Sequence, residues 1–176
     1  MDLMTHRKPS GKIKYFLLTV CILYSVSTCF SQNQKELEEK IRDSIDNEFI
    51  KNYSNCSLNS KNGVTNFNGK IEFWKICELQ DGNRIIQIES HSESTYFQEI
   101  YFEKKGKLLY AREAQNYIPI NSFEQIRWNC EFYIQNNRVI TTMSLGHGKT
   151  EDEEWDENMI LEMYSKRISE IEKIQL

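Results

Sequence analysis

The sequence predicts an α+β fold, in which a six-stranded antiparallel meander sheet is bracketed by an N-terminal and a C-terminal helix. Six short runs with alternating apolar and polar residues lie within residues 70–145. The turns between them are too short to cross over into parallel pairing. Apolar residues recur at helical spacing before and after this region. The composition, 39% hydrophobic and 27% charged, is that of an ordinary soluble protein that can bury one core.

The first 31 residues predict a secretory signal peptide. Basic residues between His6 and Lys14 precede an apolar run from Phe16 to Val26, and small residues follow. A membrane-spanning helix needs about 20 apolar residues, and this run is roughly half as long. We therefore expect an exported protein with no transmembrane span after processing.

Two processing routes fit the end of this segment. Cleavage after Ser31 leaves small residues, Cys29 and Ser31, at the positions that signal peptidase requires, and starts the mature chain at Gln32. We favour this route. In the alternative, Val26-Ser-Thr-Cys29 resembles a lipobox, and Cys29 carries a lipid anchor. Both routes predict a secreted or periplasmic protein, and the abundance of Asn, Lys and Ile favours a bacterial source.

Charge narrows the class of partner. Four of the 22 basic residues and one of the 26 acidic residues precede Gln32, which leaves 18 basic and 25 acidic side chains and a net charge of −7. Such a surface repels phosphate backbones, so we expect no nucleic-acid partner.

The remaining residues, 32–176, predict one domain that opens with a helix over residues 33–50. Its apolar stripe recurs every fourth residue, at Leu37, Ile41, Ile45 and Phe49. Residues 51–69 are rich in Asn, Ser and Gly and predict a long loop. Residues 64–67 could form a short edge strand, and the sequence does not decide between this strand and the loop.

The sheet is predicted over residues 70–145 as three consecutive hairpins. The first turns at Asp81-Gly82, a strong hairpin signal. The second and third hairpins have similar amino-acid sequences, which begin at Glu99 and at Glu131. The stretch from Tyr101 to Leu108 resembles the aromatic, glycine and leucine spacing of MORN-type hairpin repeats, and this resemblance implies a hairpin but no activity.

A second helix is predicted over residues 151–174. Thr150 and Glu153 have the spacing of a capping box, and several acidic residues suit the positive end of the helix dipole. The apolar stripe of this helix should lie across the sheet. We expect both helices to share one face of that sheet, which leaves the other face open.

Alternation along the strands predicts a candidate binding surface. If Ile100, Phe102, Trp128 and Phe132 face the core, the opposite face is acidic and aromatic. Paired carboxylates beside aromatic side chains are groups that bind or hydrolyse a glycan. The simpler interpretation, which we favour, is that cross-strand pairs stabilise a solvated sheet. The candidate ligand-binding residues are Trp74, Glu99, Tyr101, Arg127, Glu131 and Tyr133.

Three cysteines follow the signal peptide: Cys56, Cys77 and Cys130. They allow three single disulfides, each with one free thiol. We favour a bond between Cys56 and Cys77, which would stabilise the fold by roughly 3 kcal/mol. The alternative is that all three side chains stay reduced.

The sequence contains no pattern of nucleophile, base, metal ligands or phosphate-binding glycines. We therefore expect no metal, no cofactor and no enzymatic activity. The favoured interpretation is a non-catalytic, inhibitor-like or interaction module that binds an unknown protein partner through its open sheet face or edge. The alternative is a carrier of a small apolar ligand, in a pocket lined by Trp128, Phe132 and the helices.

Overall fold

The computed structural model describes residues 34–56, 60–67, 69–119 and 125–174. The predicted signal peptide, residues 1–31, and the possible anchor at Cys29 lie outside these ranges. The chain divides into two compact units, residues 1–41 and residues 42–176. The described part of the first unit, residues 34–41, is helical. In the part of the chain that the structure describes, no helix is both long enough and apolar enough to cross a membrane.

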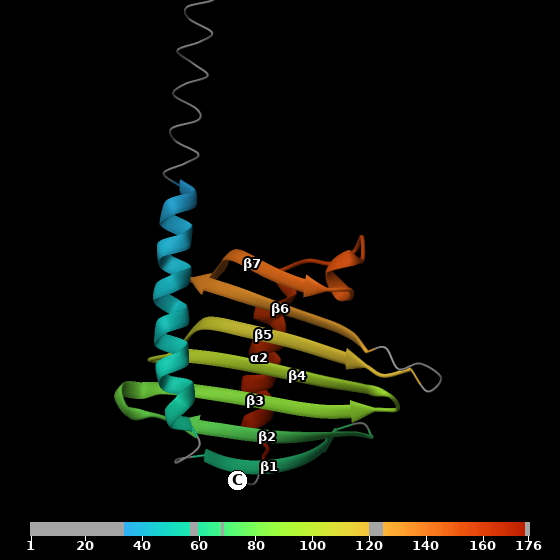
Figure 1. The fold of residues 1–176 in the computed structure, drawn as a ribbon. Helices are drawn as coiled ribbons and strands as arrows, with labels where there is room; N and C mark the ends of the chain where they lie inside the picture. The colour runs from blue at the N-terminus through green and yellow to red at the C-terminus, as the bar shows by residue number, and fades with distance from the viewer. Residues whose placement is uncertain (1–33, 57–59, 68, 120–124, 175–176) are drawn as a thin grey trace, which may run out of the picture. The chain divides into compact units, whose positions relative to one another are not determined.

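The second unit contains a sheet of seven antiparallel strands, in which each strand pairs with the next one along the chain (Figure 1). The antiparallel meander is thereby confirmed, but the predicted number of six strands is wrong. The strands are β1 (Ser60–Phe67), β2 (Lys70–Glu78), β3 (Asn83–Ser92), β4 (Thr95–Lys104), β5 (Lys107–Tyr117), β6 (Ile126–Gln135) and β7 (Arg138–Gly146).

The additional strand is β1, which lies within the predicted loop of residues 51–69. Its residues, Ser-Lys-Asn-Gly-Val-Thr-Asn-Phe, have the composition of a loop. An edge strand pairs through backbone groups with one neighbour and buries little, so its side chains need not be apolar. The pairing of β1 with β2 runs from Ser60 opposite Cys77 to Phe67 opposite Lys70.

Tight turns keep successive strands adjacent. Asp81 and Gly82 both have positive φ, as do Lys105 and Gly106. The third predicted turn, at Asn136 and Asn137, also has φ values of 53° and 59°. Two consecutive residues in this conformation give the turn a twist that matches the strands that it connects.

The helices differ in length from the prediction. The N-terminal helix, residues 34–55, runs five residues beyond the predicted end. In its last turns the amides of Asn52 and Asn55 donate to the backbone carbonyls of Glu48 and Lys51, so these asparagines are accommodated within the helix.

The C-terminal helix, α2 (Met159–Ile171), is shorter than predicted and begins later. The predicted capping box is wrong, because the hydroxyl of Thr150 accepts a hydrogen bond from the indole of Trp128 instead. Residues Lys149–Glu151 form a separate 3₁₀ turn, η3.

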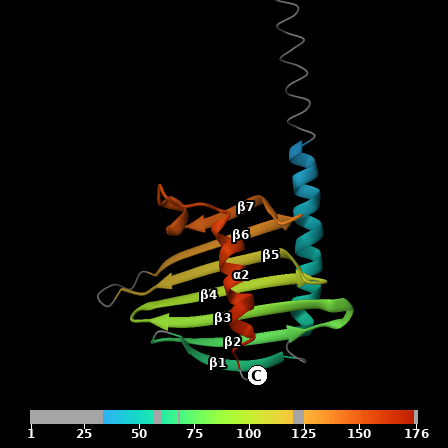
Figure 2. The same cartoon turned by 180° about the vertical axis from the view of Figure 1, so that it is seen from behind.

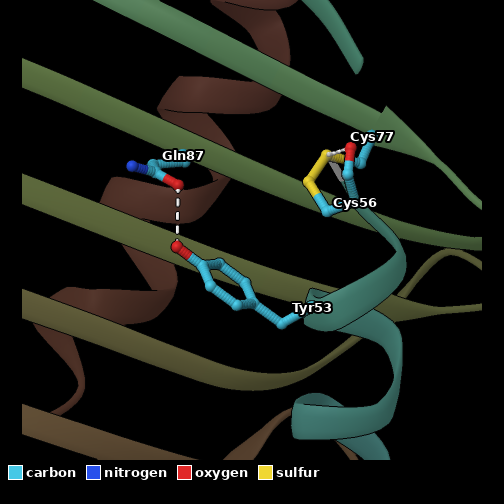
Figure 3. Close-up of a disulfide and its surroundings, with 4 residues drawn as sticks. All are labelled: Tyr53, Cys56, Cys77 and Gln87. Carbon is cyan, nitrogen blue, oxygen red and sulfur yellow. Dashed lines mark hydrogen bonds between the residues drawn. A yellow bond between two sulfur atoms is a disulfide. The ribbon is translucent and has the colours of Figure 1, made fainter. Parts of the chain in front are cut away.

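The two helices lie on opposite faces of the sheet, so the prediction of a shared face is wrong (Figures 1 and 2). Residues 42–55 of the N-terminal helix pack on one face: the ring of Phe49 stacks on Tyr110 at 4.5 Å and contacts Phe102. On the same face a disulfide joins Cys56 to Cys77, the pairing favoured from the sequence (Figure 3).

The main core lies on the other face, under α2. Its centre is formed by buried apolar side chains from β2 to β6, and Ile160, Tyr164, Ile168 and Ile171 of α2 pack on them. Among the sheet residues are Trp74, Ile76, Ile86, Ile88, Tyr101, Ala111, Trp128, Cys130, Phe132 and Ile134. Burial of these side chains supplies most of the driving force for folding.

One arginine ties α2 to this core. Arg167 donates to Glu99 of β4 at 2.8 and 2.6 Å, and to Glu72 of β2 at 3.0 Å through each of two nitrogens. It also donates to Glu170 on its own helix at 2.8 Å, and its guanidinium lies 5.5 Å from the ring centroid of Trp74. We call Arg167 and these three carboxylates the ion cage.

Replacing Arg167 should be severely destabilising. Arg167→Met would leave Glu72, Glu99 and Glu170 buried without their shared cation, so we expect the free energy of unfolding to fall by about 3–5 kcal/mol in urea titrations. The matched control is Lys166→Met, because the Lys166 side chain is exposed and lies 4.0 Å from Glu170. That variant should change stability by less than about 0.5 kcal/mol. Equal midpoints for the two variants would contradict this account of the cage.

The ion cage also predicts a dependence on pH. Burial alone would raise the pKa of Glu99, but the hydrogen bonds and charge of Arg167 outweigh it and lower that pKa. The resulting stabilisation is complete above the unfolded-state pKa of about 4.3 and is lost as the pH falls through the lower folded-state value. Stability should therefore decline below about pH 4.3 in the wild type, and more gently in Glu99→Gln. Parallel profiles for both proteins would contradict the role of Glu99.

The cysteines should react in a fixed order. Cys130 is buried, and burial raises the pKa of its thiol to about 12. Iodoacetamide should therefore label none of Cys56, Cys77 and Cys130 in the native protein, only Cys130 after unfolding, and all three after unfolding with reduction. Peptide mapping by mass spectrometry reads each position separately. Labelling of Cys56 in unfolded, unreduced protein would contradict the disulfide.

Candidate functional site

The six predicted ligand-binding residues lie on two different faces of the sheet. Trp74, Glu99 and Tyr101 are on the α2 face, whereas Arg127, Glu131 and Tyr133 are on the face that carries the N-terminal helix. Strand register sets this division: Tyr101 pairs with Ala111, which in turn pairs with Phe132. Cross-strand partners share a face, so Tyr101 lies on the side of Phe132 and not of its neighbour Tyr133. The prediction that the six form one surface is wrong.

On the α2 face, the three residues serve the core. Trp74 is buried, and its indole nitrogen donates to the hydroxyl of Thr65 at 2.9 Å. Glu99 belongs to the ion cage, and it accepts a further hydrogen bond from the hydroxyl of Tyr101 at 2.9 Å. These groups are already paired within the protein.

On the other face, the remaining three differ in burial. The buried Tyr133 donates to Asp46 of the N-terminal helix and to Glu131, and Glu131 also accepts from Tyr110. The pKa of Asp46 is raised, first by its burial and also by the nearby charge of Glu131. Arg127 is exposed and donates to Gln125. Only Arg127 and Glu131 of the six therefore face solvent on this side.

On the face that carries residues 42–55 of the N-terminal helix, the sheet surface beyond that helix is uncovered (Figure 1). We call it the open face. Register places on it alternate residues of β1 to β5, which are Val64, Ile71, Phe73, Lys75, Gln87, Glu89, Tyr96, Gln98 and Arg112. This surface differs from the predicted one, because neither Glu99 nor Tyr101 belongs to it.

Three neighbouring apolar side chains next to the sheet edge are exposed on the open face. Phe73 pairs directly with Val64 across β1 and β2, and Ile71 lies two residues from Phe73 on the same side. Their exposed fractions are 52% for Phe73, 64% for Val64 and 51% for Ile71. We call these three residues the apolar patch. Contiguous exposed apolar area of this kind marks an interaction surface more often than isolated apolar residues do.

A groove of about 540 Å³ lies over the patch. Val64 and Phe73 form its apolar part, and Lys75, Gln87 and Glu89 supply polar groups of both charges. Tyr53, at the end of the N-terminal helix, reaches over the sheet and donates from its hydroxyl to Gln87 at 3.2 Å (Figure 3). The disulfide between Cys56 and Cys77 fixes the segment that carries Tyr53.

Beside the groove, polar side chains form a connected lattice. Glu89 accepts from the amides of Gln87 and Gln98, and Gln98 in turn accepts from Arg112. Gln98 also donates to the hydroxyl of Tyr96 at 3.1 Å. Burial, with the nearby charge of Glu89, raises the pKa of Tyr96 to about 12, so this hydroxyl stays protonated. Side chains held in this way lose little further freedom on binding.

Metal chemistry finds no support in the described ranges, which contain no group of three or more His, Cys, Asp or Glu side chains placed to hold an ion. No protein-family model matches the chain, and neither curated proteins nor solved structures show significant similarity to it. Functional proposals therefore rest on the geometry of the described residues.

The patch escaped prediction because both faces of β2 are apolar. Trp74 and Ile76 alternate with Ile71, Phe73 and Cys77, so alternation along this strand does not distinguish an inner from an outer face. A signal did exist in the neighbouring segment: within β1, Val64 lies between polar residues and glycine, and Phe67 is the strand's other large apolar residue.

Proposed function

We propose that this protein is an interaction module that binds a partner protein through the open face, with the apolar patch at the centre of the contact. The observation that carries the proposal is the exposure of Val64, Ile71 and Phe73 side by side on one ordered surface. Removing apolar surface from water contributes roughly 25 cal/mol per Å². A partner that covers these three side chains gains that free energy.

The surroundings of the patch suit a protein better than a small ligand. Hot spots in protein interfaces are apolar or aromatic side chains ringed by polar groups that exclude water. Here Phe73 and Val64 are bordered by Lys75, Gln87 and Glu89. The groove reaches the free edge of β1, so a partner can extend past it and contact the edge strand. One Lys and one Glu leave the contact nearly neutral.

Export, as expected from the first 31 residues, would place this partner in the envelope or outside the cell. The carrier alternative has less support, because Phe132, one of the side chains expected to line its pocket, is packed within the core, and charged and amide side chains line much of the cleft beside Trp128. Trp128 and Phe132 are buried in the core under α2. No reaction is proposed for the open face, where Glu89 and Arg112 are hydrogen-bonded to glutamine side chains.

Site-specific photo-crosslinking tests the proposal. A photoreactive amino acid at position 73, in protein expressed in its source cells, should give one discrete crosslinked product. The control position is 159, because Met159 is also about half exposed, at 51%, but begins α2 on the opposite face. The partner identified from the crosslink is then purified, and its affinity is measured by calorimetry. Phe73→Ser should weaken binding at least tenfold, or about 1.4 kcal/mol, and Met159→Ser should not.

Three outcomes would contradict the proposal. Equal crosslinking from positions 73 and 159 would mean that the patch has no specific occupant. A product that contains two copies of this chain would assign the patch to self-association. An isolated partner whose affinity does not change in Phe73→Ser would place the contact elsewhere.

A further inference from the structure

A second site lies on the opposite face of the sheet, in a cleft of about 260 Å³ under α2. The strand register determines its floor. Phe97, Gln115 and Trp128 form one cross-strand row, and Glu99 and Glu113 pair directly in the next row. Met163 and Arg167 of α2 form the roof. The cleft has the volume of about nine water molecules, which is enough for one small ligand.

Glu113 is the group in this cleft that lacks a full set of partners. Its side chain is 8% exposed, and its Oε1 atom accepts from the ammonium of Lys149 at 2.6 Å. No hydrogen bond from another described residue reaches its Oε2 atom. Oε2 is not among the fully buried side-chain atoms that lack a partner, so it remains accessible to a molecule in the cleft. A ligand that donates a hydrogen bond to Oε2 would complete this set.

Cations close both ends of the cleft. Lys149 lies 5.6 Å from the centroid of the Trp128 ring, and Lys70 lies at the same distance from the centroid of Phe97. Lys70 also pairs with Glu72 at 3.1 Å. Every cation that borders the cleft therefore has a carboxylate partner: Lys149 has Glu113, Lys70 has Glu72, and Arg167 has the ion cage. Because these charges are paired, the cleft favours a neutral ligand over an anion or a cation.

The walls of the cleft are apolar. Phe97 and Met163 are half-buried side chains, and Trp128 forms the back wall. A ligand with one apolar face and several hydroxyl groups fits this combination, since its C–H face contacts Phe97 and Met163 while its hydroxyls meet Glu113, Lys149 and Gln115. A sugar ring has that distribution of groups.

Contacts of the segment after β7 with Trp128 hold Lys149 beside Glu113 in the cleft. Gly148 packs against the Trp128 ring so closely that a Cβ atom there would overlap the indole. The next residue but one, Thr150, accepts from the Trp128 indole nitrogen at 3.1 Å. Lys149 is held between these two contacts and points to Glu113. Gly148, Lys149 and Thr150 thus each have a structural role at the edge of the cleft.

From these observations we infer that the cleft under α2 binds a single neutral sugar ring, with Glu113 as the hydrogen-bond acceptor and Phe97 and Met163 as the apolar walls. This inference does not depend on the proposed function, because the open face and the cleft lie on opposite faces of the sheet. Glu99 is held by Arg167 and Tyr101, so Glu113 has no second free carboxylate to act with it as two-carboxylate hydrolysis requires, and binding without hydrolysis is expected.

Saturation-transfer NMR on the purified protein tests the inference. The probes are D-glucose, D-galactose, D-mannose and N-acetyl-D-glucosamine at millimolar concentration, with glycerol, acetate and n-butylammonium as comparison compounds. At least one sugar should receive saturation at its ring C–H protons, and a titration should give a millimolar dissociation constant. Glu113→Gln should weaken this binding at least tenfold, because Lys149 would hold the amide oxygen and the ligand would meet an NH2 donor where the carboxylate offers an acceptor.

Two further variants make the test selective. Glu89→Gln makes the same chemical change on the open face and should leave sugar binding unaltered. Phe97→Leu keeps an apolar side chain but removes the aromatic wall, and it should weaken binding even if Glu113→Gln proves unstable. Phe73→Ser should not affect the sugar, and Glu113→Gln should not affect partner crosslinking, so the two proposals can fail separately.

The inference is overturned if none of the four sugars receives saturation, or if Glu113→Gln and Glu89→Gln weaken binding equally. Stronger binding of acetate or n-butylammonium than of any sugar would also overturn it, because that result contradicts a charge-balanced cleft. Equal binding of glycerol and the sugars would show that no ring is recognised.

Discussion

The contact between Arg167 and its three carboxylates is the constraint on which the arrangement of the second unit depends. Its partners come from β2, β4 and α2, so one guanidinium fixes the helix across the middle of the sheet. Fork-shaped donors match two carboxylates in defined directions, which an ammonium cannot do. Apolar packing alone would let α2 slide along the core, since Ile160, Tyr164 and Ile171 can fit neighbouring grooves. The ion cage selects one position of the helix, and that position determines where Met163 lies.

The N-terminal helix covers only part of its face of the sheet. On the face that carries the N-terminal helix, the sheet is uncovered in the region beyond residues 42–55 (Figure 1). The apolar patch is exposed because the N-terminal helix ends before it, where Cys56 is bonded to Cys77. Only Tyr53 extends further. The length of one helix therefore decides how much apolar surface remains for a partner.

Much of this fold could be predicted from the sequence, and the failures have specific physical causes. Turn residues such as Asp81-Gly82 and Asn136-Asn137 located the hairpins, because few other residues tolerate positive φ. Face assignment failed because it assumed that one side of each strand is solvated, whereas Glu99 and Tyr101 are buried under α2. Arg167 occupies the helical stripe of Ile160, Tyr164 and Ile171, so its position indicated burial although its charge suggested solvent. The open face depends on where a helix ends, which local sequence encodes weakly.

The ion cage and the cleft are connected through one cross-strand pair. Glu99 and Glu113 are directly opposed on β4 and β5, where two ionised carboxylates would repel each other. Arg167 neutralises the first, and Lys149 pairs with only one oxygen of the second. The repulsion is thereby removed without occupying the second oxygen of Glu113. A sheet that needed only stability would place an apolar residue at this buried position, because a buried ion pair seldom stabilises more than apolar packing does. A buried carboxylate that is paired with one cation through one oxygen, with its second oxygen left to a cleft, is better explained by a ligand than by the fold.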